Sequence, residues 1–321
     1  MTEFQLNKIL CGDALEMIRT LPSDSIDCAV TSPPYFGLRD YGVAGQIGLE
    51  ETPEEYIERL VDVFMEVYRV LKPTGTFWLN VGDSYAGSGH GYLSEVKGKQ
   101  STNKGTLFMA NRPPAKIPAG LKAKDLIGIP WMLAFELRRA GFYLRQDIIW
   151  HKPNPMPESV RDRCTKSHEH IFLLSKSKKY YFDYCAIQEE AAYDGRKDTI
   201  NKGAKKRDNN NKSYANGYDK PKERWQKNAH EEFVRNKRDV WSVCTKAEKD
   251  AHFAVFPDRL IVDCIKAGCP ENGIVLDPFM GSGTTAVVAR KLNRNYIGIE
   301  LNPKYVEIAE RKIYRELGMF A

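Results

Sequence analysis

Two short motifs in this chain of 321 residues combine residue types that suit ligand binding and group transfer. The first is Thr31-Ser32-Pro33-Pro34-Tyr35, which directly follows the apolar run IDCAV. Two prolines fix the backbone and remove two N–H donors, so the polar backbone groups that this loop presents are acceptors. Tyr35 adds an aromatic ring that can stack on a planar ligand. The motif predicts a site for a planar molecule that donates an amine hydrogen; the alternative is an ordinary Pro-Pro turn.

The second motif is DPFMGSGTT, residues 277–285, which follows the apolar run GIVL and precedes a helix-forming segment. Glycines let a backbone approach a ligand closely, and the start of a helix offers unpaired N–H donors. The motif lacks the spacing of dinucleotide and phosphate-binding loops, which disfavours pyrophosphate and triphosphate ligands. The next predicted strand ends at Glu300, whose carboxylate can accept hydrogen bonds from two ribose hydroxyls. These residues predict a nucleoside-sized ligand; the alternative is a turn in which Asp and Gly only satisfy local geometry.

The periodicity of the apolar residues predicts that both motifs lie at the ends of strands in an α/β sheet. Strands are expected at 7–11, 26–31, 76–81, 143–150, 170–174, 273–276 and 296–300. Helices are expected at 14–21, 53–71, 125–140, 256–267, 284–292 and 304–316. Alternating strands and helices are typical of a mostly parallel sheet with helices on both faces, where ligands bind at the carboxyl ends of the strands.

Two segments interrupt this alternation, residues 84–120 and residues 188–238, and both are expected to be loops or small insertions. Within the second, residues 195–238 contain 14 Lys or Arg and 6 Asp or Glu, a local charge of +8 in a chain whose total is +6. A concentrated basic stretch predicts a polyanionic partner, nucleic acid being the commonest, or else a solvated loop.

The composition is typical of a globular protein without membrane-spanning segments. Hydrophobic residues make up 42% of the chain and charged residues 28%, and no apolar run approaches the roughly 18 residues of a membrane span. The first residues, MTEFQLNKIL, do not resemble a secretory signal, so we expect a cytoplasmic protein. The chain has seven cysteines, and no two of them form a Cys-x-x-Cys pair. Most lie in apolar segments, as small core residues do. Disulfides and a structural metal are not expected.

Taken together, the SPPY motif near the start and DPFMGSGTT near the end resemble the amino-methylating DNA methyltransferases. The resemblance is to the permuted group, in which the catalytic motif precedes the cofactor motif, and it covers nearly the whole chain. It implies a Rossmann-like methyltransferase sheet that binds S-adenosyl-L-methionine and acts on double-stranded DNA. It further implies a catalytic and cofactor-binding domain at 1–187 and 239–321, with an inserted basic target-recognition region at 188–238. The resemblance also implies a possible partner, a restriction endonuclease of the same restriction-modification system.

The same resemblance implies roles for individual residues. The catalytic residues would be Ser32, Pro33, Pro34 and Tyr35, with the Tyr35 ring stacked on a base that is flipped out of the duplex. The cofactor-binding residues would be Asp13, Phe253, Phe256, Pro257, Asp277, Phe279, Gly281, Gly283, Thr284, Thr285, Glu300, Asn302 and Pro303. Relatives often carry proline at Phe253, so the chain departs from the family there, and no metal is implied.

The residue at position 32 bears on which base is methylated. Adenine-directed relatives more often carry Asp there, so Ser32 favours the N4 amine of cytosine. The N6 amine of adenine is the alternative, because the same acceptors serve either amine, and a DNA-binding module without catalysis is a third. Trp150 to Pro155 follow a strand at the same sheet edge and either border the base pocket or form a plain turn. His168-Glu169-His170 is interpreted as structural rather than metal-binding.

Overall fold

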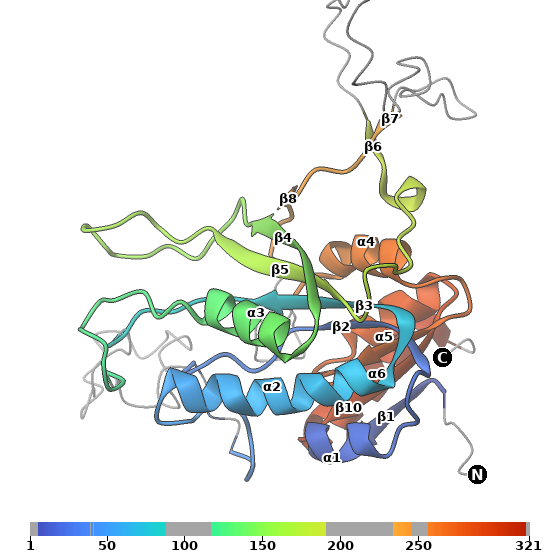
Figure 1. Ribbon diagram of the computed structural model, residues 1–321, viewed down its shortest axis with the longest axis horizontal. Helices are drawn as coiled ribbons and strands as arrows, with labels where there is room; N and C mark the ends of the chain where they lie inside the picture. Colours follow the sequence, from blue (N-terminus) through green and yellow to red (C-terminus); the bar gives the residue numbers. More distant parts are fainter. Residues whose placement is uncertain are drawn as a thin grey trace, which may run out of the picture. The chain divides into compact units, whose positions relative to one another are not determined.

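The computed structural model describes residues 6–38, 40, 42–87, 117–190, 234–245 and 256–318. The chain separates into two units: unit 1 comprises Met1–Asp183 with Asp239–Ala321, and unit 2 comprises Tyr184–Arg238. Unit 1 contains an eight-stranded sheet, and Figure 1 labels most of its strands and helices. The described part of unit 2 contains the 3-10 turn η2 (Cys185–Ile187) and an antiparallel ladder of β6 (Glu189–Glu190) and β7 (Val234–Arg235).

Strands and helices alternate along most of unit 1. Its described strands are β1 (Lys8–Cys11), β2 (Ile26–Thr31), β3 (Leu71–Val81), β4 (Tyr143–His151), β5 (His168–Ser175), β8 (Val240–Ser242), β9 (Ile274–Asp277) and β10 (Asn295–Glu300). Its described helices are α1 (Ala14–Arg19), α2 (Pro53–Val70), α3 (Ile129–Ala140), α4 (Asp258–Gly268), α5 (Thr284–Lys291) and α6 (Pro303–Leu317). The strand order is β1-β10-β9-β2-β3-β5-β4-β8, and among these strands only β5 runs antiparallel to its two neighbours. The predicted α/β fold with a mostly parallel sheet is confirmed.

Helices cover both faces of the sheet because apolar side chains point to both sides of its strands. Phe77, Leu79 and Val81 of β3 belong to a buried cluster that also contains side chains of α1, α2 and α3. The alternate residues of a strand point to the opposite face. There the Thr76 hydroxyl donates a hydrogen bond of 3.0 Å to the carbonyl of Gly268, the last residue of α4. The strands therefore lie between two helical layers, and their carboxyl ends remain free to form a site.

Helix α3 begins at Ile129 rather than at 125, because a distant residue sets its start. Gly128 has a φ of +87°, which is incompatible with the helix. The Asp83 carboxylate, which follows β3, accepts the N–H groups of both Gly128 and Ile129 at 3.0 to 3.2 Å. Asp83 thus takes the place of a local N-cap, and local periodicity cannot reveal a cap that comes from 45 residues away.

Three other features differ from the sequence-based expectations. Strand β8 is only three residues long, too short for a periodicity signal, and it forms by pairing with Ile149–His151 of β4. Strand β3 begins at Leu71 rather than at 76. Three cysteines are buried, but Cys11, Cys164, Cys185 and Cys244 are exposed, so the prediction that most cysteines lie in the core was wrong.

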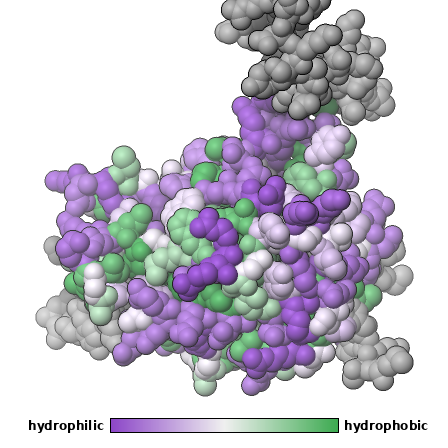
Figure 2. All heavy atoms as spheres, viewed as in Figure 1, coloured by the Kyte–Doolittle hydropathy of each residue, from purple (hydrophilic) through white to green (hydrophobic). Residues whose placement is uncertain are grey.

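The surface carries both polar and apolar groups. Figure 2 shows a mostly hydrophilic face with smaller groups of hydrophobic atoms between the polar ones. Among the helices that the structure describes, none combines the length and the apolar character needed to span a lipid bilayer.

Candidate active site

A cavity of about 270 Å³ lies at the carboxyl ends of the parallel strands of unit 1. Its lining comes from the segments that follow β1, β2, β8, β9 and β10, from the end of β3 and β4, and from the start of the antiparallel strand β5. Both sequence motifs contribute to it, one on each side of β2 and β9, which are neighbours in the sheet. Residues about 245 positions apart therefore share one cavity, because adjacent parallel strands end at the same edge.

Most of the residues predicted for the site line this cavity. They are Asp13, Ser32, Pro33, Pro34, Tyr35, Phe256, Phe279, Gly281, Thr284, Glu300 and Asn302. Among the described residues, five of those predicted to contact the cofactor are not part of the lining: Pro257, Asp277, Gly283, Thr285 and Pro303. Phe253 lies outside the described residues.

Asp277 does not line the cavity but forms hydrogen bonds with residues of both motifs around it. Its side chain is 1% exposed and accepts hydrogen bonds from the Thr31 and Thr285 hydroxyls, both at 2.6 Å, and from the Phe279 N–H at 3.0 Å. Thr31 precedes Ser32, whereas Phe279 and Thr285 belong to the glycine loop and helix α5. A single buried carboxylate therefore fixes the two motifs relative to each other.

Gly283 serves helix packing. It has a φ of +83°, and a Cβ at this position would lie 2.9 Å from the Cβ of Ala309 in α6. Contacts that short do not occur between real side chains, so glycine is required where the start of α5 approaches α6. The DPFMGSGTT motif thus contains one glycine that lines the cavity, Gly281, and one, Gly283, that permits the close approach of two helices.

Glu300 holds the rim of the cavity opposite the SPPY loop. Its Oε2 accepts the Gly281 N–H at 2.9 Å, and its Oε1 accepts the Asn302 N–H at 2.8 Å. Burial raises the pKa of this carboxyl, and the backbone hydrogen bonds partly offset that effect. The Leu301 backbone also donates to this carboxylate. A carboxylate can accept about four hydrogen bonds, so Glu300 retains acceptor capacity toward the cavity.

The SPPY loop is fixed by its neighbours. The Tyr56 hydroxyl of α2 donates to the Pro34 carbonyl at 2.7 Å. The Tyr35 hydroxyl donates to Glu169 Oε2 at 2.8 Å, and the Ser32 hydroxyl lies 3.4 Å from the Tyr35 oxygen. Ser32 and Pro33 directly precede these two anchored residues and line the cavity. That their oxygens accept hydrogen bonds from a ligand stays a prediction.

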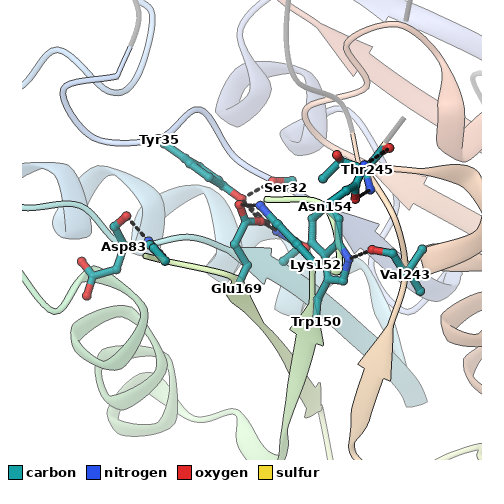
Figure 3. Close-up of polar contacts among 11 residues, drawn as sticks. Ser32, Tyr35, Asp83, Trp150, Lys152, Asn154, Glu169, Val243 and Thr245 are labelled. Carbon is teal, nitrogen blue, oxygen red and sulfur yellow. Dashed lines mark hydrogen bonds and ion pairs between the residues drawn. The ribbon is translucent and has the colours of Figure 1, made fainter. Parts of the chain in front are cut away.

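Three polar side chains, Asn80, Lys152 and Glu169, complete a cluster around Tyr35. Figure 3 labels Lys152 and Glu169 beside Tyr35. Asn80 Nδ2 donates to the Tyr35 oxygen and to Glu169 Oε2, both at 2.8 Å. Lys152 Nζ forms an ion pair with Glu169 Oε1 and lies 4.3 Å from the centre of the Trp150 ring. Trp150 and Lys152 line the cavity, as one interpretation of that segment predicts, while nothing in the sequence linked Asn80 or Glu169 to it.

The electrostatics of the cluster determine the protonation states of Glu169 and Tyr35. Burial opposes ionisation of Glu169, but the Lys152 charge and the hydrogen bonds from Lys152, Asn80 and Tyr35 outweigh it and lower the pKa. Burial, reinforced by the charge of Glu169, holds the pKa of Tyr35 well above its usual range. At neutral pH a Glu169 carboxylate therefore faces a protonated Tyr35.

The buried carboxyl of Asp277 leads to a testable pH dependence. Burial raises its pKa from 3.8 to about 6. Because the native pKa exceeds the unfolded one, Asp277 contributes stability that is complete below pH 4 and is lost as the pH rises through 6. The loss amounts to about 3 kcal/mol. Urea titrations should show the free energy of unfolding of the wild type falling by this amount relative to Asp277→Asn between pH 3 and pH 7. Parallel curves would contradict the assignment.

Comparisons with known proteins agree on one family. Residues 26–311 match the N6/N4 methyltransferase family, which is described as DNA methylase. The Type II methyltransferase M.SmaI of Serratia marcescens is 47% identical over 308 residues, which cover 96% of this chain and 91% of the relative. M.Cfr9I of Citrobacter freundii is 47% identical over 305 residues, which cover 95% and 87%.

Two solved structures share the fold. The protein TTHA0409 of Thermus thermophilus, solved in complex with S-adenosyl-L-methionine, aligns with a TM-score of 0.58 at 23% identity over 97% of this chain and 94% of its own. The cytosine-N4-specific PvuII DNA methyltransferase aligns with a TM-score of 0.59 at 18% identity over 97% and 91%.

Proposed function

This chain belongs to the N6/N4 DNA methylase family, and we propose that it is a site-specific methyltransferase that methylates the N4 amine of cytosine in duplex DNA, using S-adenosyl-L-methionine. The observation that carries the proposal is the shared cavity. Ser32 and Pro33 present acceptor oxygens on one side, while Gly281 and Glu300 form a nucleoside-sized rim on the other. A methyl donor and an acceptor base can therefore meet within one enclosed site, and positioning is a large part of the barrier reduction for such a transfer.

The residues on the cofactor side fit S-adenosyl-L-methionine. A Cβ on Gly281 would have no neighbour closer than 4.0 Å, so the space beside its backbone is open for a ligand. Glu300 would accept the ribose hydroxyls, Asp13 would meet the adenine amine, and Phe256 would close the pocket. The positively charged sulfonium supplies an activated methyl group. Of the five residues outside the lining, Asp277, Gly283 and Thr285 would act indirectly, by holding the two motifs and helix α5 in place.

The base side suits an exocyclic amine. The lone pair of such an amine is conjugated into the ring, which makes it a poor nucleophile. Hydrogen bonds from the amine to the Ser32 oxygen and the Pro33 carbonyl would draw the nitrogen toward sp³ geometry and localise the pair. The base must leave the duplex to reach this site, and the Tyr35 ring, which lines the cavity, would stack on it.

Identification of the methylated base tests the proposal. DNA treated with the protein and S-adenosyl-L-methionine is digested to nucleosides and examined by mass spectrometry. We expect N4-methylcytosine, because Ser32 stands where adenine-directed relatives more often carry Asp. N6-methyladenine would instead establish the alternative, and the absence of any methylated base would contradict both. Acting on cellular DNA, the enzyme would work in the cytoplasm and protect its sites from a restriction endonuclease.

We also propose that residues 188–238 contain the target-recognition region. Most of this segment lies outside the described residues, but its two ends are described. Glu190 of β6 pairs with Val234 of β7, so the chain enters and leaves residues 191–233 at adjacent positions. The Glu189 carboxylate ties the ends together by accepting from Arg235 at 2.8 Å and from Arg238 at 2.6 Å. Residues 191–233, with 11 Lys or Arg, can therefore be replaced by a short turn.

Replacing residues 191–233 with Asn-Gly should abolish DNA binding and leave cofactor binding unchanged, because every strand of the large sheet lies outside the segment. The intact protein should lose DNA affinity steeply with salt, by a logarithmic slope of about 0.9 per phosphate contact. A Gly/Ser segment of the same length is the matched control for chain length. If the shortened enzyme still methylates the same DNA sequence, recognition resides elsewhere, with residues 84–120 as the next candidate.

A further inference from the structure

The directions of the hydrogen bonds around Tyr35 follow from the chemistry of the side chains. An ionised Glu169 only accepts, and the Asn80 amide nitrogen, which lies 2.8 Å from both Glu169 and Tyr35, only donates. Reversing this amide would place its oxygen against the carboxylate, so its orientation is determined. The single Tyr35 proton goes to Glu169 at 2.8 Å. The contact of 3.4 Å between Ser32 and Tyr35 must then be a donation from Ser32.

The hydrogen bonds therefore run in one direction, from Ser32 to Tyr35 and from Tyr35 to Glu169. At the cavity end of this chain, the lone pairs of the Ser32 oxygen can accept a hydrogen bond. A hydrogen on a cavity ligand can bond to the Ser32 oxygen, the Ser32 proton points to Tyr35, and the Tyr35 proton points to Glu169. Every link already has the direction that proton movement from the cavity toward Glu169 requires.

Methylation of an amine creates a proton that must leave. We propose that it leaves through Ser32 and Tyr35 and is taken up by Glu169; the proposal rests on the amine methylation proposed above. The amine lone pair forms the new N–C bond while the C–S bond breaks and its electron pair remains on sulfur. The amine proton passes to Ser32 Oγ, the Ser32 proton to Tyr35 Oη, and the Tyr35 proton to Glu169 Oε2. The carboxylate becomes a carboxylic acid, and charge is conserved.

Glu169 is held where this transfer requires it. Its side chain is 12% exposed and that of its partner Lys152 is 18% exposed, so bulk water has little access to either. Lys152 rests on the Trp150 ring, and the Trp150 indole N–H donates to the Val243 carbonyl at 2.8 Å. The Lys152 charge, despite burial, keeps the pKa of Glu169 low enough for it to start the reaction ionised.

The backbone makes room for the contact between Tyr35 and Glu169. A Cβ on Gly82 would lie 2.7 Å from Cε2 of Tyr35 and 3.3 Å from Cδ of Glu169. Only glycine at this position allows the ring and the carboxylate to approach each other at the end of β3. The relay is therefore supported by a main-chain feature as well as by the side chains in Figure 3.

The decisive variant is Tyr35→Phe, which keeps the aromatic ring for stacking and removes the hydroxyl that links Ser32 to Glu169. Its single-turnover rate at saturating S-adenosyl-L-methionine and DNA should fall on the order of 100-fold, the low end of the effect of general acid–base groups. Cofactor affinity and the identity of the methylated base should not change. A wild-type single-turnover rate in Tyr35→Phe would overturn the relay and leave a stacking role intact.

The pH profile provides a second, independent measurement. The titratable groups that interact electrostatically with Glu169 are Tyr35, Lys152 directly after β4, Lys166 before β5, and His168 of β5. Lys152→Met should move the acid limb of the single-turnover rate to higher pH, because it removes the charge that keeps Glu169 ionised. Glu169→Gln should abolish that limb, and His168→Gln is the control that should leave it in place. An acid limb that stays unmoved in Lys152→Met, or persists in Glu169→Gln, contradicts the proposal.

These outcomes separate the relay from the proposed function. Both cytosine and adenine amines lose one proton on methylation, so the relay test is valid for either base. If the wild type forms N4-methylcytosine and Tyr35→Phe forms it at an unchanged rate, the relay alone fails. If the wild type methylates no base, the proposed function fails, and the relay fails with it.

Discussion

Replacing Gly281 with tryptophan should abolish binding of S-adenosyl-L-methionine. Gly281 lines the cavity, and a Cβ there would extend into open space, with the nearest atom, the Phe279 carbonyl oxygen, 4.0 Å away. An indole in that space would occupy the volume that the cofactor needs. Titration calorimetry should show at least about a 100-fold loss of affinity, which corresponds to about 2.7 kcal/mol.

The matched control is Gly281→Ala. Gly281 has a φ of +55°, a conformation that costs a residue with a side chain about 1 kcal/mol, so alanine reports the backbone strain without filling the cavity. Its affinity loss should stay below about 10-fold. A folded Gly281→Trp variant with unchanged affinity would remove this loop from the cofactor site.

Replacing Gly268 with alanine should destabilise the protein by about 3 to 5 kcal/mol, although alanine ordinarily favours helices. A Cβ at Gly268 would lie 2.3 Å from Trp78 Nε1 and 2.4 Å from Thr76 Oγ1. Both side chains are buried, and they form a chain of hydrogen bonds in which Trp78 donates to Thr76 and Thr76 donates to the Gly268 carbonyl. Displacing them breaks buried hydrogen bonds as well as packing. Urea titration measures the loss.

Gly141→Ala is the corresponding control, because Gly141 also ends a helix but a Cβ there meets nothing within 4 Å. Its φ of +129° should cost only about 1 kcal/mol. Comparable losses at the two glycines would show that crowding against Trp78 and Thr76 is not the cause.

The two motifs could be located from the sequence because their signals are local. Paired prolines, a glycine turn and an apolar run before each motif depend only on neighbouring residues, and they placed Ser32 to Tyr35 and residues 277–285 at strand ends. The alternation of strands and helices then implied that both lie at the carboxyl edge of one sheet. The cavity contains both, as this reasoning predicts.

Local signals could not distinguish the residues that touch the cavity from those that support it. Asp277 and Gly283 belong to the same motif as Gly281, yet one carboxylate is consumed by Thr31 and Thr285, and one glycine is required by Ala309. Thr31 and Ala309 come from elements outside the motif, β2 and α6. A residue that contacts the ligand and a residue that supports the site can have the same type and spacing in the sequence. Only the packing of the folded chain shows which role each residue has.

The cluster around Glu169 is a product of the tertiary structure. Glu169 lies opposite Trp150 in the register of β4 and β5, and β5 lies beside β3, which carries Asn80. This order brings Asn80 from β3, Glu169 from β5 and Lys152 from the residue after β4 to Tyr35. Strand order and register depend on the summed packing of the whole sheet, since a shift of one residue would turn each side chain to the other face. The sequence alone therefore determined the fold class and the two motifs, while the tertiary structure decided which polar groups meet at the site.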